Sequence, residues 1–135
     1  MYIADGKTNG PAFSWPDGKR IAVMVTFDYD AEFLRISRAK SKGTSIGFTD
    51  FSRGQYGPHE GLARCLDMLD TMNIKSTFFV PGAVIETYRD TVEEIHRRGH
   101  ELACHGYRHE SDPELSRDEM IKILEKSEAL LAEIT

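Results

Sequence analysis

The sequence predicts an α/β fold built from parallel βα units. Three short apolar runs of strand length alternate with segments whose apolar residues recur at helical spacing. Alternation of this kind favours right-handed crossovers and a parallel sheet. Polar residues suited to chemistry directly follow the first and third runs, at the expected carboxyl ends of strands, where such sheets gather their sites.

The length and composition fit one ordinary domain. We divide the 135 residues into an irregular Gly- and Pro-containing lead-in, 1–20, and a domain at 21–135. A net charge of −5 gives no electrostatic reason to expect nucleic acid as a partner. We find no apolar run of membrane-spanning length and no signal-peptide layout, so we expect a cytoplasmic protein. Cys65 and Cys104 are expected to be buried free thiols.

The first strand is expected at residues 21–27, a continuous apolar and β-branched run typical of a strand buried on both faces. Residues 31–58 then form a long connection, in which residues 31–42 could begin a short helix. Long loops in compact domains are more often functional than idle. This one follows the first strand and could form part of a substrate rim.

The remaining elements follow in regular order. A helix is expected over 59–73, and a second strand over 74–80 is closed by Pro81 and Gly82. Residues 90–93 have capping-box form and open a helix that stops at Gly99. Residues 101–104 are the third strand, and the capping box at 116–119 opens the last helix.

Four polar residues at the two strand ends suggest a metal site. His105 and His109 are spaced i and i+4 just after the third strand, so both imidazoles can turn toward one point as metal ligands. Asp28 and Asp30 end the first strand, where residues i and i+2 face the same side. One aspartate would bind the metal while the other works as a base. The other histidines lack such company and are interpreted as structural or surface residues: His59, His96 and His100.

Two histidines and one carboxylate leave coordination positions open, as a catalytic metal requires. A divalent ion in such a site lowers the pKa of a coordinated water to about 7 and polarises a neighbouring carbonyl. The residues therefore predict a metal-dependent hydrolase that acts at a carbonyl group, and we expect an amide.

Both site stretches resemble known motifs. Residues 26–30, Thr-Phe-Asp-Tyr-Asp, look like a Thr-Phe-Asp-Asp motif with one residue inserted. Residues 105–109, His-Gly-Tyr-Arg-His, look like a His-Ser/Thr/Gly-x-x-His motif. These are the first two motifs of the NodB-type polysaccharide deacetylases, carbohydrate esterase family 4. Residues 75–82 and 98–102 also match segments of that family, and the resemblance runs from about residue 20 to the end.

The resemblance implies a distorted (β/α) barrel and assigns roles to the site residues. By it, Asp28 is the catalytic base, and Asp30, His105 and His109 hold a divalent metal, with zinc the usual expectation. The implied reaction is attack of metal-bound water on an N-acetyl group of a polysaccharide or peptidoglycan, or of a smaller amide. Aromatic and strand-end neighbours are candidate substrate-binding residues: Tyr29, Tyr56, Pro81 and Tyr107.

Two alternatives remain open. Residues 27–32, Phe-Asp-Tyr-Asp-Ala-Glu, and the loop 53–57 are similar to a branch that contains peptidoglycan deacetylases and cofactor-free allantoinases, so a cyclic amide hydrolase is the second candidate. The family's later motifs, an arginine segment, a tryptophan/aspartate segment and a Leu-x-His, are not found before Thr135. The third candidate is therefore a catalytically incomplete unit that binds metal or carbohydrate.

The number of βα units also bears on the assembly. Three units are too few to close a barrel. Either the sequence is a fragment of a longer protein, or another copy completes the open sheet as a homo-oligomer.

Overall fold

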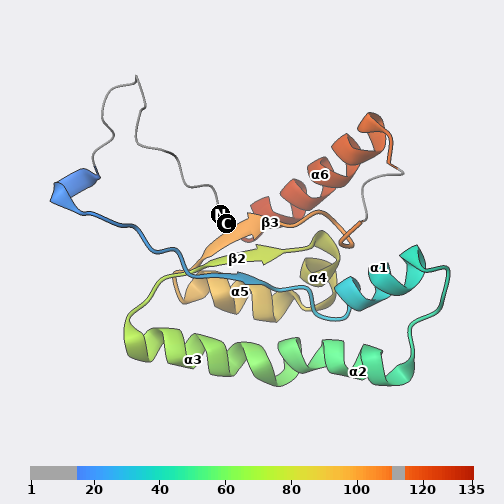
Figure 1. Cartoon of the computed structure of the whole chain (residues 1–135), viewed down its shortest axis with the longest axis horizontal. Helices are drawn as coiled ribbons and strands as arrows, with labels where there is room; N and C mark the ends of the chain where they lie inside the picture. Colours follow the sequence, from blue (N-terminus) through green and yellow to red (C-terminus); the bar gives the residue numbers. More distant parts are fainter. Residues whose placement is uncertain (1–14, 111–114) are drawn as a thin grey trace, which may run out of the picture.

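A computed structural model describes residues 15–110 and 115–135 of the chain. Strands β1 (Thr26–Asp28), β2 (Thr77–Val80) and β3 (Glu101–Cys104) form a parallel sheet in the order β1-β2-β3 (Figure 1). In the register, β2 begins opposite the first residue of each neighbour, so all three carboxyl ends lie at one edge. The predicted α/β fold with parallel strands is confirmed.

Helices cover both sides of this sheet. In Figure 1, α3 and α5 lie below the strands and α6 lies above them, beside β3. A short 3-10 turn, η1 (Pro16–Gly18), precedes β1. The helical elements that follow among the described residues are, in chain order, α1 (Phe33–Ser41), α2 (Phe48–Tyr56), the π-helical segment η2 (Gly57–Gly61), α3 (Leu62–Met72), α4 (Gly82–Thr87), α5 (Arg89–Arg97) and α6 (Arg117–Ala132).

The core lies between β2 and the helices α3, α4 and α5. Phe78 and Val80 of the central strand are almost fully buried, against side chains such as Leu66 of α3 and Ile95 of α5. Burying each such side chain contributes roughly 1.5–3 kcal/mol. This packing fixes β2, and with it the positions of the loops that follow β1 and β3.

The first strand is shorter and more exposed than its apolar run predicted. β1 comprises three residues and, among the described residues, pairs with β2 alone, which makes it an edge strand. Ile21, Val23 and Met24 stand 74–86% exposed before it. The expectation of a strand over 21–27 buried on both faces was wrong, because no other described segment covers this stretch.

The long connection expected at 31–58 is mostly helical. The helix that residues 31–42 could begin is confirmed as α1, but α2 and the start of η2 lie where a loop was expected. Tertiary contact explains α2: Gly54 is buried against the backbone of Glu32, and a Cβ at Gly54 would lie 2.4 Å from the Glu32 Cα atom. The helix propensities of the individual residues cannot predict that contact.

Other boundaries differ in detail. β2 starts at Thr77, later than expected, and Pro81 is the N-cap of the unexpected helix α4 rather than part of a simple turn. The helix α5 starts at Arg89 with no side-chain cap, so the box predicted at 90–93 does not form. The capping box between Ser116 and Glu119 is confirmed in both directions.

Both cysteines are free thiols, as expected, although they are half-buried rather than buried. Residues 1–14 of the predicted lead-in lie outside the described residues. Among residues 15–110 and 115–135, no helix combines the length and apolarity needed to cross a membrane.

Candidate metal centre

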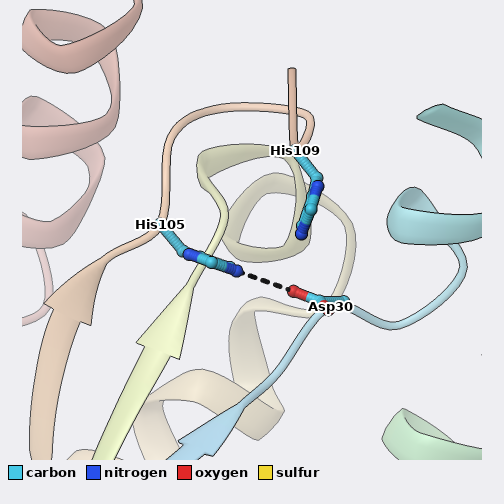
Figure 2. A group of neighbouring side chains, drawn as sticks. All are labelled: Asp30, His105 and His109. Carbon is cyan, nitrogen blue, oxygen red and sulfur yellow. Dashed lines mark ion pairs between the residues drawn. The ribbon is translucent and has the colours of Figure 1, made fainter. Parts of the chain in front are cut away.

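Three of the four predicted site residues converge at the carboxyl edge of the sheet. Ligand atoms of Asp30, His105 and His109 all lie within 4.8 Å of one another. Asp30 lies just beyond β1, His105 directly follows β3, and His109 returns from the loop after it (Figure 2). The sheet thus joins ligands that are 75 and 79 positions apart in the sequence.

The geometry of the three side chains suits a cation. Asp30 Oδ1 and His105 Nε2 are 3.3 Å apart, and the two imidazole rings are perpendicular with centroids 4.9 Å apart. Asp30 Oδ1 and His105 Nε2 are both buried, and neither has a hydrogen-bond partner among the described residues. Buried polar atoms left unpartnered are costly. Two imidazole nitrogens and a carboxylate oxygen are a donor set that fits zinc and other divalent ions.

The electrostatics of Asp30 are also consistent with a cation at this position. Burial raises the pKa of its carboxyl group, and the charge of Asp28 raises it further, while His105 and His109 act in the opposite direction. A divalent cation beside this carboxylate would favour its charged form.

Asp28 is near this group but does not belong to it. It is the exposed last residue of β1, and its charge acts on Asp30. The strand alternation that predicted both carboxylates on one face does not extend to Asp30, because β1 ends two residues earlier. Asp30 reaches the histidines from the turn after β1.

The loop that carries the histidines is fixed by contacts from distant elements. The Gly106 carbonyl accepts hydrogen bonds from the Gly82 N–H, at 3.0 Å, and from the Ser127 hydroxyl of α6, at 2.8 Å. The Tyr107 carbonyl accepts one from the Ala83 N–H at 2.8 Å. The first turn of α4 and the side of α6 therefore hold the segment between the two ligands.

The far end of the loop has its own supports. The Ser37 hydroxyl of α1 donates to the His109 carbonyl. The Glu110 carboxylate accepts from the N–H groups of Tyr107 and Arg108 at 3.0–3.1 Å. These bonds hold His109 in a left-handed conformation, φ 57°, which non-glycine residues rarely adopt.

Two of the four candidate substrate-binding residues are buried. Tyr29 is 6% exposed, its hydroxyl lies 2.8 Å from the Thr91 hydroxyl, and burial raises its pKa to about 12. Pro81 is fully buried at the start of α4. Tyr29 belongs to the hydrophobic core of the domain.

The other two are more accessible. Tyr56 is 54% exposed on α2. Tyr107 is half-buried, donates its hydroxyl to Glu86 at 2.6 Å, and has the Lys126 ammonium 3.7 Å from its ring centre. The hydrogen bond from Tyr107 is the main reason why the pKa of Glu86 is lowered.

A cleft of about 450 Å³ opens beside the histidines. His105 and His109 line one part of it, and apolar side chains of α6, including Ile123 and Leu124, line another. The two histidine ligands therefore border this cleft, whereas Asp30 is not among its lining residues.

Sequence reasoning missed the supporting residues of the site. Ser37 and Ser127 carry no recognisable sequence signal, because each acts only through a distant carbonyl. Glu110 directly follows His109, and Gly82 follows Pro81 at a strand end, but only the structure shows what they contact. The remaining histidines are consistent with their interpretation as structural or surface residues: His100 is buried, and His59 and His96 are exposed.

The fold and this arrangement agree with the similarity of the chain to known proteins. The chain belongs to the polysaccharide deacetylase family, whose sequence profile matches residues 16–135. It is 33% identical to the peptidoglycan deacetylase of Helicobacter pylori over 117 residues, which is 87% of this chain and 39% of that protein.

Solved structures share the fold of this chain. A Mycobacterium smegmatis protein described as a polysaccharide deacetylase is 39% identical with a TM-score of 0.80, over 94% of this chain and 44% of that one. The PuuE allantoinase, at 20% identity, shares the fold with a TM-score of 0.80 over 95% of this chain and 47% of that one. The chain thus spans less than half the length of each of these three proteins.

Proposed function

We propose that this chain carries the metal-binding part of a metal-dependent deacetylase acting on N-acetylated sugars of a polysaccharide or peptidoglycan. The convergence of Asp30, His105 and His109, with two buried ligand atoms that have no hydrogen-bond partner facing one another at 3.3 Å, is the observation that carries the proposal. Membership of the polysaccharide deacetylase family and the similarity to a peptidoglycan deacetylase support the substrate class.

Each residue has a distinct part in this proposal. Asp30, His105 and His109 would hold the divalent ion, for which zinc is the first expectation. When bound, the ion would supply an activated water and a polarised acetyl carbonyl. Asp28, exposed and close enough for its charge to act on Asp30, would accept the water's proton as the catalytic base.

The aromatic neighbours would handle the substrate. We propose Tyr56 and Tyr107 as sugar contacts because both are at least partly accessible and a tyrosine presents an apolar face with a polar tip. Tyr29 and Pro81, whose side chains are buried, would act by holding the backbone next to the ligands.

The first experiment measures metal binding. Zinc is titrated into the metal-free chain by calorimetry, with Asp30→Asn and His105→Ala as variants. We expect one ion per chain with micromolar or tighter affinity, and loss of that binding in both variants, since each removes a ligand. If the purified chain retains no divalent ion and binds none at micromolar concentration, the proposal fails.

The second experiment measures turnover. Acetate release from N-acetylglucosamine oligomers is followed with the zinc-loaded chain and with Asp28→Asn. We expect release by the wild type and none by Asp28→Asn, which should still bind zinc because Asp28 is outside the ligand group. Zinc binding without acetate release would favour the catalytically incomplete unit.

An allantoinase-like activity is the second candidate. Residues 27–32 are similar to a branch that contains both peptidoglycan deacetylases and allantoinases, and likeness of fold to PuuE allantoinase is compatible with this candidate. A chelator separates the two candidates, because a metal-independent hydrolase would turn over allantoin with or without it. Acetate release that the chelator abolishes would exclude this second candidate as the main activity.

Self-association is part of the proposal as well. β1 has one unpaired edge among the described residues, and the exposed apolar residues before it would gain from burial. Analytical ultracentrifugation of the purified chain over a range of concentrations tests for a second copy. If the chain is a monomer at every concentration, the proposed self-association is wrong.

A further inference from the structure

The turn that carries Asp30 has an unusual backbone. The Asp30 carbonyl accepts a hydrogen bond from the Phe33 N–H at 3.0 Å, which closes the turn between β1 and α1. Ala31 lies within it at φ 49°, a left-handed conformation that alanine rarely adopts. Such a conformation persists only where the surroundings hold it in place.

Glu32, also in this turn, is a carboxylate in a buried environment. It is 4% exposed, yet it forms no ion pair with any described cationic side chain. Its partner is the Tyr88 hydroxyl, which lies 3.0 Å from both carboxylate oxygens. Burying a carboxylate without a hydrogen-bond partner costs free energy. The Tyr88 hydroxyl therefore stabilises the position of the Glu32 side chain.

A second anchor on the other side of Asp30 reaches the same part of the fold. The Tyr29 hydroxyl lies 2.8 Å from the Thr91 hydroxyl. The Thr91 hydroxyl also donates to the Tyr88 carbonyl at 2.7 Å, so both anchors belong to one turn at the start of α5. Asp30 is bracketed between them.

The backbone of α2 closes the remaining side. A Cβ added at Gly54 would lie 2.4 Å from the Cα and 2.7 Å from the Cβ of Glu32. Glu32 therefore cannot shift toward α2, and the Tyr88 hydroxyl holds its other end. The turn has little freedom to move relative to β3 and the loop that follows it.

We propose that Glu32 is a positioning residue, which, through the Tyr88 hydroxyl, fixes the turn that presents Asp30 to His105 and His109. This inference rests on the proposed metal site. Glu32 does not belong to the ligand group, and its role is to keep Asp30 in one conformation before an ion arrives. Residues that orient metal ligands in this way typically affect metal affinity by about 10- to 100-fold.

The test uses Tyr88→Phe, Glu32→Ala and Glu32→Gln. Binding of Co²⁺ is measured by chelator competition, and its visible d–d spectrum reports the geometry around the ion. We expect Tyr88→Phe and Glu32→Ala to weaken binding about tenfold or more and to alter the spectrum. Glu32→Gln keeps an oxygen that can accept from Tyr88, so it should restore binding relative to Glu32→Ala.

Ile95→Val is the matched control. Ile95 is fully buried on the same helix, α5, and its truncation lowers stability without removing any of the hydrogen bonds that hold the turn. It should leave both affinity and spectrum unchanged. Wild-type affinity and an unaltered spectrum in Tyr88→Phe and Glu32→Ala would overturn the inference and leave Glu32 a purely structural residue.

Hydrogen exchange in the metal-free chain separates this inference from the proposed function. We expect the Phe33 amide, which closes the turn, to exchange faster in Tyr88→Phe than in Ile95→Val after correction for global stability. If the wild type binds no Co²⁺ or Zn²⁺, the proposed function fails. Unchanged Phe33 exchange in Tyr88→Phe would overturn the positioning role itself.

Discussion

Replacing Gly82 with alanine tests whether the first turn of α4 sets the position of the histidine loop. A Cβ at residue 82 would lie 2.7 Å from the Tyr107 ring carbon Cδ2, 3.1 Å from the Ser127 hydroxyl and 3.2 Å from a Leu130 methyl carbon. The first of these distances is shorter than atoms tolerate. Since Tyr107 separates the two histidine ligands in sequence, any yielding moves the loop.

The neighbours have little room to yield. The Tyr107 ring is held by its hydrogen bond to Glu86 and by the Lys126 ammonium, and Ser127 is fully buried. Overpacking of this kind costs about 1–3 kcal/mol. The gain in helix propensity from glycine to alanine is at most about 1 kcal/mol. We therefore expect a net loss of up to about 3 kcal/mol in the free energy of unfolding.

Urea unfolding of the metal-free chain measures this loss, and zinc titration measures the accompanying loss of affinity, expected at about tenfold. Gly47→Ala is the matched control, because a Cβ at Gly47 meets nothing within 4 Å. It should change the unfolding free energy by no more than about 0.5 kcal/mol. If Gly82→Ala behaves like Gly47→Ala in both assays, the argument that this contact positions the loop is refuted.

Three further predictions concern the metal, pH and α6. Zinc at about 100 times its dissociation constant should raise the free energy of unfolding by about 2.7 kcal/mol, and Asp30→Asn should lose this gain; an equal gain in the variant would place the ion elsewhere. Burial, aided by the charge of Lys75, lowers the pKa of His100, so the unfolded chain takes up a proton more readily. The stability linked to His100 should thus be complete above about pH 6.5 and fall as the pH drops below it, by at most about 1.4 kcal/mol per pH unit. Urea unfolding at several pH values should give a shallower acid loss for His100→Gln, and parallel profiles would contradict the assignment. Ser127→Ala removes the hydroxyl that binds the Gly106 carbonyl and should cost about 1–2 kcal/mol, measured by urea unfolding; no loss would mean that this bond does not stabilise the loop.

The identities of the candidate ligands could be predicted from the sequence, because residue type and placement carry them. His105 and His109 follow a short apolar run that forms β3, and Asp28 and Asp30 follow the apolar run 21–27, which overlaps β1. The carboxyl ends of parallel strands meet at one edge, so recognising the strands was enough to bring distant residues together. The apolar run of β3 was recognised at its true length, whereas that of β1 was overestimated.

The helical nature of residues 48–58 could not be predicted, since their sequence is rich in glycine and polar residues. The close contact of Gly54 with Glu32 makes α2 possible, and such a contact exists only once the chain has folded. Tertiary packing here overrides weak local propensity.

The sequence by itself determined the parallel α/β class and the set of side chains able to hold a metal, because periodicity and residue chemistry are local properties. Only the tertiary structure decided that Asp30 joins the two histidines while Asp28 stays outside, since β1 ends between them. It also decided how the ligands are held, through Gly82, Ser127 and the Glu32–Tyr88 pair. Those supports depend on hydrogen bonds between residues 21 to 56 positions apart, which a linear sequence does not display.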